Sequence, residues 1–226
     1  MTRDTFHLKN LAIDASINSY YGGIYGSWKR DEFFLNMSLL GAYNNYNTKR
    51  KINFATIDRQ AKAKHEGNDW LTHFGLGYQL GSPNFQLTPY INLDLVQQHE
   101  RGYTETGAGS LDLQVHKKNA TLFQGEAGIV LCRTYHTENG EFIPQLTLAY
   151  LKQSPWSSKN YRANFTNSPV VFTNKGENYE RNLFAPRLDL TYKNFSHKAK
   201  FSFYYGAKVS NGYLAQNVGL DLTFHF

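Results

Sequence analysis

The segment NVGLDLTFHF (residues 217–226) alternates between two kinds of residue. The apolar set falls on every second position: Val218, Leu220, Leu222, Phe224 and Phe226. Because successive side chains of a strand point to opposite faces of its sheet, the segment predicts a β-strand with one apolar and one polar face. The last residues of a soluble protein are usually frayed and polar, whereas here the apolar pattern continues to the final residue.

The same alternation recurs along the 226 residues, and helical periodicity does not. In FQLTPYINLDL (85–95), Leu93 shares an apolar face with Phe85, and Asn92 lies on the opposite, polar face. We therefore predict about nine strands. They cover residues 17–28, 33–47, 68–80, 85–98, 121–136, 141–154, 181–193, 199–210 and 215–226.

The connections between these strands alternate in length. KRDE (29–32), GSPN (81–84), TENG (137–140) and NFSHK (194–198) have the composition of tight turns. Residues 48–67, 99–120 and 155–180 are long and polar, and NGYL (211–214) is a short connection on the same side. This is typical of an up-and-down meander whose two ends face different environments. No linker tract divides the chain, so we expect a single domain over residues 1–226.

Two architectures fit alternating strands: a soluble sheet that buries its apolar face, and a membrane barrel that turns it toward lipid. The predicted strands, about 12–15 residues long, exceed the ~5–6 of an average strand and the ~9–11 that cross a bilayer. Aromatic residues near strand ends fit the aromatic girdles of outer-membrane barrels: Trp28, Trp70, Tyr135, Trp156 and Tyr192. The predicted fold class is therefore all-β, an up-and-down antiparallel transmembrane β-barrel.

This fold makes a prediction for individual side chains. Five apolar residues should face lipid: Leu93, Leu148, Leu190, Phe203 and Leu222. Four polar residues should line the interior: Asn92, Thr147, Asp189 and Thr223. Three prolines fall inside predicted strands, where they cannot donate a ladder hydrogen bond, so we expect bulges near the rims: Pro89, Pro144 and Pro186.

Other classes of protein find little support in the sequence. The longest apolar stretch, residues 129–132, is far shorter than the ~18 residues of a transmembrane helix. The N-terminal MTRDTFHLKNLAIDAS (1–16) lacks the apolar core of a signal peptide. Cys132 is the only cysteine, which excludes an internal disulfide and indicates a small buried or wall-facing residue. The net charge of +6 would suit nucleic acid or lipid phosphates, but the many aromatic residues favour a membrane.

No enzymatic, metal or cofactor site is evident. The eight histidines are scattered, without the spacing of metal ligands. Asp94, His99 and Glu100, near one rim, are of the types that a barrel hydrolase uses, but their positions are those of ordinary loop residues. The cationic segment 48–67, which begins with TKRKI (48–52), has two interpretations. It is a solvated loop or strand extension, or it contacts the anionic phosphates of lipopolysaccharide.

The C-terminal strand resembles the assembly signal of Gram-negative outer-membrane barrels, which in this chain consists of Asn217, Gly219, Leu222, Phe224 and Phe226. More specifically, the chain resembles the translocator barrel of autotransporters (type V secretion), over essentially its whole length. The resembling segments are YYGGIYGSW (20–28), NYNTKRKI (45–52), LTPYINLDL (87–95), GYTETGAGSLDLQV (102–115) and FIPQLTLAY (142–150).

The resemblance implies a twelve-stranded barrel in the bacterial outer membrane, with a helix through its lumen, that anchors and helps to export an upstream passenger domain. The nine predicted strands match the last nine of the twelve. With the missing signal peptide, this predicts an N-terminally truncated copy whose first strand, near residues 17–28, pairs poorly with the last.

The implied partners are outer-membrane lipid and lipopolysaccharide, the barrel-assembly machinery and a passenger domain in cis, with no nucleic acid. The assembly machinery would recognise the last strand as an exposed edge. Two alternatives remain open. One is an outer-membrane barrel that acts through its long loops as an adhesin or enzyme. The other is a soluble β-sandwich that binds a ligand.

Overall fold

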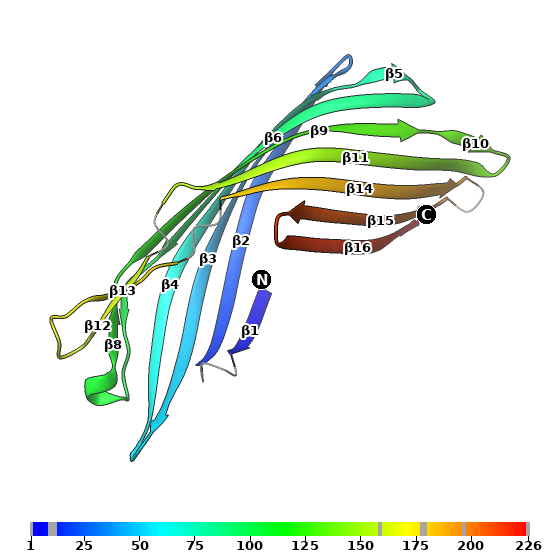
Figure 1. The fold of residues 1–226 in the computed structure, drawn as a ribbon. Coiled ribbons are helices and arrows are strands. Elements are labelled where there is room, and N and C mark those ends of the chain that lie inside the picture. Colours follow the sequence, from blue (N-terminus) through cyan, green and yellow to red (C-terminus); the bar gives the residue numbers. More distant parts are fainter. Residues whose placement is uncertain (1, 9–12, 158–159, 177–179, 196–197, 225–226) are drawn as a thin grey trace.

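One curled antiparallel sheet makes up most of the computed structural model, which describes residues 2–8 (backbone only), 13–157, 160–176, 180–195 and 198–224 (Figure 1). Each strand pairs with its neighbours in chain order, which confirms the predicted up-and-down meander. The strands along the sheet are β1 (Thr2–Leu8), β2 (Ile13–Arg30), β3 (Phe33–Phe54), β4 (Ile57–Tyr78), β6 (Phe85–Glu100), β9 (Lys118–Arg133), β11 (Gly140–Pro155), β14 (Arg181–Asn194), β15 (Ala199–Ser210) and β16 (Tyr213–Phe224).

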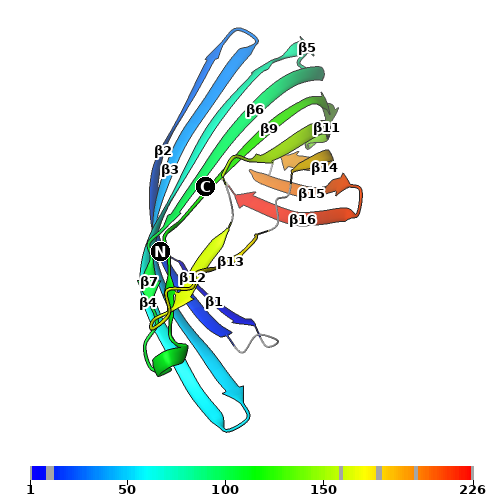
Figure 2. The ribbon, with the colours of Figure 1, turned by 60° about the vertical axis from the view of Figure 1, so that its left-hand side comes forward.

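The sheet is open. Within the described residues, β1 pairs only with β2 and β16 pairs only with β15, and no ladder joins the two ends. This confirms the predicted open edge, although β1 rather than β2 forms it. The prediction of nine strands was one too few, because the described path includes β1 and so has ten. Figure 2 shows the curl, with β2 on one flank and β16 on the other.

The two ends of the sheet differ as predicted. Short turns at residues 31–32, 83–84 and 138–139 lie at one end, beside β5 and β10 in Figure 1. The β3–β4 turn at residues 55–56 and the segments between β6 and β9 and between β11 and β14 lie at the opposite end. We call these the short-turn end and the long-connection end. The described residues contain no helix with the length and apolar character that a transmembrane helix needs.

The predicted strands at 33–47 and 68–80 were too short. Of the two forms considered for residues 48–67, a loop or a strand extension, the structure shows the strand extension, because β3 and β4 run through these residues as one hairpin of two 22-residue strands. They pair without interruption from Phe33 and Tyr78 to Phe54 and Ile57. The side chains still alternate here, but in the opposite sense. Ile52 is buried on the face that is polar elsewhere, and lysines occupy the face that is apolar elsewhere. A search for outward apolar residues therefore ended both strands too early.

The other two predicted loops, 99–120 and 155–180, also contain strands, which form a small second sheet in the order β13-β12-β8-β7. Its strands are β7 (Tyr103–Thr104), β8 (Leu113–Val115), β12 (Tyr161–Phe165) and β13 (Phe172–Asn174), with one 3-10 turn, η2 (Gly109–Leu111).

This second sheet continues the wall of the first. Tyr103 pairs with Val115 in the same register in which Glu100 pairs with Lys118, so β7 and β8 extend β6 and β9. The pairs of β12 with β8 and β13 are offset by one residue from those of β11 with β9 and β14. The four strands therefore resume their pairing beyond short joints at the long-connection end.

Each of the three prolines lies where its strand pairs with one neighbouring strand but not with the other. Pro89 pairs with β9 but has no partner on β4, and pairing resumes at β5 (Leu80–Ser82). Pro144 pairs with β14 but has none on β9, and pairing resumes at β10 (Tyr135–Thr137). Pro186 pairs with β11 while the β14–β15 ladder skips it. A proline lacks the backbone N–H that a ladder needs, which explains each interruption.

Candidate functional site: the two faces of the wall and the last strand

The register of the main sheet separates its side chains into two faces. Residues paired across a ladder lie on the same face, so the pairs can be followed from strand to strand. They confirm that Leu93, Leu148, Leu190, Phe203 and Leu222 share one face, which we call the outer face. Asn92, Thr147, Asp189 and Thr223 share the opposite, inner face.

Burial shows which face is concave. The buried side chains of the main sheet all lie on the inner face: Asn44, Ile52, Ala61, Ala63, His65, Ala149, Leu151 and Leu183. Curling a sheet crowds side chains on its concave side and spreads them on its convex side. The inner face is therefore the concave one, and the apolar outer face is convex.

The outer face is uncovered. Ile24 and Leu220 are 74% and 77% exposed, and Met37, Ile91 and Leu188 are also exposed there. Soluble monomers rarely expose a contiguous apolar surface of this extent, and such surfaces mark sites of contact with protein or membrane. A lipid-facing wall accounts for this pattern, and a soluble sandwich with this face packed inside does not.

The five aromatic residues singled out from the sequence all have their rings on the outer face. Tyr135 stacks on Phe142, with ring centroids 6.4 Å apart, and both lie near the short-turn end. Trp156 stacks on Phe123 at 5.1 Å, toward the long-connection end. Trp28, Trp70 and Tyr192 follow the same face by register. Rings at both ends of an apolar band are the arrangement of an aromatic girdle.

The inner face carries a network of polar side chains at the middle of the wall. Gln153 donates a 2.9 Å hydrogen bond to Gln124, and Gln124 donates one of 3.1 Å to Asp94. Tyr90 donates its hydroxyl to Glu126 at 2.7 Å. Hydrated or mutually bonded groups of this kind suit a polar lumen, because they would be costly against lipid.

The residues considered as a possible hydrolase site do not come together. Asp94 faces inward and lies 2.7 Å from His73, between Oδ1 and Nδ1, whereas His99 lies on the outer face and hydrogen bonds Asn119. Glu100 faces inward and contacts His65. The sequence did not single out His73, since only the register reveals that it lies opposite Asp94. No three or more potential metal ligands in the described part of the chain are grouped to hold an ion.

At the long-connection end, the segment between β7 and β8 packs on the inner face of the β3–β4 hairpin. Arg50 donates to both carboxylate oxygens of Glu105 and to the carbonyl of Leu111. The hydrogen bonds to Glu105 raise the pKa of Arg50. Ile52 and Ala61 form a small apolar core with Ala108 of the same segment.

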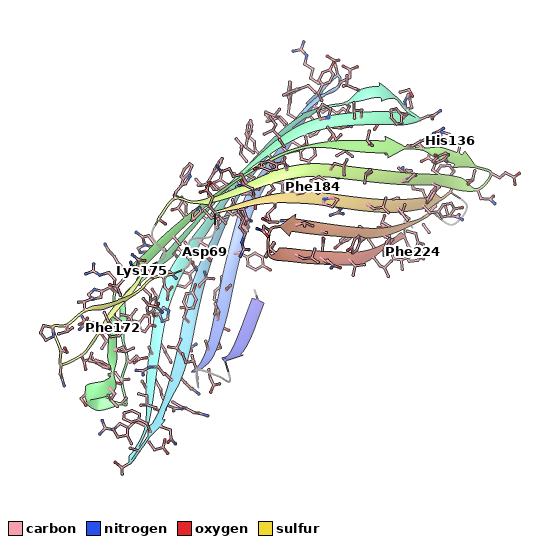
Figure 3. The ribbon with its side chains drawn as sticks, in the orientation of Figure 1. Asp69, His136, Phe172, Lys175, Phe184 and Phe224 are labelled. Carbon is pink, nitrogen blue, oxygen red and sulfur yellow. The ribbon has the colours of Figure 1, made fainter. Side chains whose placement is uncertain are left out.

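An aromatic stack ties β7 to the hairpin. The His65 ring lies between Tyr46, at 4.7 Å, and Tyr103, at 4.0 Å. The Tyr103 and Tyr161 hydroxyls are 2.6 Å apart, and burial, followed by this bond, raises the pKa of Tyr103 far above its usual value. Within the described residues, His65 Nδ1 and Oδ1 of Asp69 (labelled in Figure 3) are buried without a hydrogen-bond partner.

The last strand presents the proposed assembly signal at a free edge. Leu222 and Phe224 are more than half exposed on the outer face, and Figure 3 labels Phe224 near the end of β16. Asn217 and Gly219 lie on the inner face, opposite Gly206 and Tyr204. Phe226 lies outside the described residues.

Two known sequences or families are similar to this chain, and the family agrees with this architecture. A family model for the autotransporter β-domain matches residues 1–206. An uncharacterized protein in the trpE–trpG intergenic region of Pseudomonas putida is 29% identical over 103 residues, or 44% of this chain. The chain covers only 17% of the length of that protein.

Proposed function

This chain belongs to the autotransporter β-domain family, and we propose that it serves as an outer-membrane translocator that anchors a passenger domain and helps to export it to the cell surface. Autotransporter β-domains are translocator barrels, and membership of this family supports the general role of a translocator in the bacterial outer membrane. We propose that this chain exports a passenger.

The observation that supports this function best is the division of the wall into a convex apolar face and a concave polar face. Lipid solvates the convex face, while the concave face offers groups such as Asn92 and Thr147 to an unfolded chain and its water. The mechanism is passive, because the wall shields a passenger segment from lipid while it crosses. We propose no enzymatic step, cofactor or metal, and no nucleic acid as a partner.

Epitope tags in cells test both the orientation and the export. The natural gene product would carry the same short epitope at one of three places: ahead of residue 1, between residues 55 and 56, or between residues 138 and 139. We expect antibody to stain intact cells for the first two and only permeabilised cells for the third. The third variant is the matched control, because its turn lies at the short-turn end, which faces the periplasm in barrels of this type.

Different results of the epitope experiment test export, orientation and outer-membrane location. Staining at residues 55–56 without staining ahead of residue 1 would leave an anchored barrel that exports nothing. Staining at residues 138–139 on intact cells would contradict the orientation. Recovery of the protein from the soluble fraction, with no heat-dependent shift of its gel mobility, would contradict the outer-membrane role altogether.

One observation favours the alternative of a barrel enzyme. Ser38, His73 and Asp94 occupy one cross-strand row of the inner face. Within the described chain, however, no hydrogen bond joins the Ser38 hydroxyl to His73, and a nucleophile needs such a contact with its base. Labelling by a serine-reactive fluorophosphonate that is lost in Ser38→Ala, and kept in Ser27→Ala, would establish that alternative.

A further inference from the structure

The outer face of the β3–β4 hairpin carries a group of exposed lysines. Lys49 and Lys51 lie on β3, and Lys62 and Lys64 lie on β4. Lys49 is directly opposite Lys62 in the ladder. Like charges in this relation destabilise a strand pair, so folding alone does not account for their placement.

Three of these lysines line a hollow of about 360 Å³ on the outer face. The hollow is lined by Asn47, Thr48, Lys49, Lys62, Ala63, Lys64, Thr104 and Thr106. Lys49, Lys62, Lys64 and Asn47 belong to the outer face by register, whereas the side chains of Thr48 and Ala63 lie on the inner face. No carboxylate is among the lining residues. We call it the lysine hollow.

The acidic side chains near the lysine hollow lie outside its lining. Asp14 lies opposite Lys49 on β2, and Asp58 lies near the tip of the hairpin. Glu66 follows Lys64 on the same face but forms an ion pair with Arg101. In the part of the chain that the structure describes, no ion pair or hydrogen bond joins the ammonium group of Lys49, Lys62 or Lys64 to another side chain.

The hollow lies beyond the apolar band, toward the long-connection end. Lys64 precedes Trp70 by six positions on the same face, which is about 20 Å along a strand and about 15 Å of height at a typical barrel tilt. The long connections of bacterial outer-membrane barrels face the cell exterior. The lysine hollow is therefore at the level of headgroups, directly above the lipid-facing wall.

We propose that the lysine hollow binds phosphate groups of the lipopolysaccharide that surrounds the wall in the outer leaflet. Ammonium groups, hydroxyls and amides are suitable partners for phosphate, and charge-assisted bonds are the stronger ones. The occupant is a membrane lipid because the hollow continues the face that contacts lipid. This proposal rests on the outer-membrane role proposed above, and bound phosphate would offset the repulsion between Lys49 and Lys62.

A binding assay with the purified full chain in a nonionic detergent tests the proposal. The probes are lipopolysaccharide, the same material after enzymatic removal of its phosphates, phosphatidylglycerol micelles and a short duplex DNA. The test variant is Lys49→Gln/Lys62→Gln/Lys64→Gln. The control variant is Lys29→Gln/Lys200→Gln/Lys208→Gln, which loses the same charge from the inner face.

We expect the test variant to bind lipopolysaccharide about tenfold more weakly or worse, the loss expected for one or more charged hydrogen bonds. The control variant should bind as the wild type does. Dephosphorylated lipopolysaccharide should bind wild type and test variant equally weakly. The test variant should also resist heat at least as well as wild type without lipid, since it loses a like-charge pair.

Equal losses in the test and control variants would overturn the proposal in favour of diffuse charge attraction. Binding of DNA or phosphatidylglycerol as tight as that of lipopolysaccharide would overturn it too. Because the assay is done in detergent, its result does not depend on where the chain resides in cells. The binding assay can therefore contradict phosphate binding at the lysine hollow without contradicting the outer-membrane role, which the experiments in cells test.

Discussion

The ring of Tyr204 on β15 lies over Gly219 on β16 so closely that a Cβ atom at Gly219 would clash with the ring. The guanidinium of Arg187 lies 4.3 Å from the centroid of the same ring. Replacing Gly219 with alanine would displace the ring or the strand, and we expect it to cost about 1–3 kcal/mol of unfolding free energy. Thermal unfolding in detergent measures this.

The control for that change is Gly26→Ala on the outer face, where a Cβ atom meets nothing within 4 Å. It should alter stability by less than about 0.5 kcal/mol. Adding Tyr204→Ala to Gly219→Ala should remove most of the extra cost. Equal effects of the two glycine substitutions would contradict the close contact.

Neighbouring residues on β6 test which face meets lipid. Leu93→Arg puts a charge on the outer face, and we expect a loss of up to about 2–4 kcal/mol, the cost of arginine near the bilayer midplane of a barrel. Asn92→Arg puts the same charge on the inner face and should cost little. Folding into phospholipid vesicles at graded urea concentrations measures both. The orientation is wrong if Asn92→Arg proves the more damaging of the two.

The ion pair between Arg50 and Glu105 should hold the segment between β7 and β8 against the hairpin. Glu105 is buried, so Arg50→Ala leaves a buried carboxylate without its partner, at a cost of about 3–5 kcal/mol in comparable pairs. We expect chymotrypsin, which cleaves after aromatic residues and leucine, to cut within residues 99–120 at least tenfold faster. The exposed pair of Arg101 with Glu66 provides the control, and Arg101→Ala should change the cleavage rate little. An unchanged rate in Arg50→Ala would show that other contacts hold the segment.

Deletion of Phe226 tests whether this residue serves recognition by the assembly machinery or only side-chain packing. Its deletion removes one ring, worth about 1.5–3 kcal/mol of burial at most, which a stable wall tolerates. If the assembly machinery recognises the last strand by its end, deletion should lower the amount inserted in cells while the inserted protein stays equally heat resistant. Phe184→Ala removes an outer-face ring far from that end and should leave insertion unchanged. Normal insertion with lower heat resistance after deletion would mean that Phe226 only packs.

The alternating strands could be predicted because one physical rule governs them throughout the apolar band. Where lipid and lumen meet opposite faces, each strand must alternate, and so Leu93 and Asn92 were assigned to the correct faces. The pattern changes beyond the band, where the outer face carries exposed lysines and the inner face carries buried apolar side chains. There Lys62 points outward and Ala61 packs inward, so the strand at residues 48–67 had the inverse of the pattern that was sought.

Contacts between distant segments could not be predicted from the sequence. The pairing of His73 with Asp94 and that of Arg50 with Glu105 depend on register, which a sequence pattern alone does not fix to the residue. The strands of the second sheet are only two to five residues long. They are held by pairing with their neighbours rather than by their own propensity. The lysine hollow likewise combines a hairpin with Thr104 and Thr106 from a segment about forty residues away along the chain.

The joints between the two sheets limit where the chain can change in length. An extra residue at 101–102 or 116–117 would exchange the faces of every side chain beyond it and undo the continued register. An insertion at 167–171 or 55–56 lies past the last paired row and disturbs no ladder. Evolutionary length variation, and any foreign peptide grafted for surface display, should therefore accumulate at the tips and spare the joints.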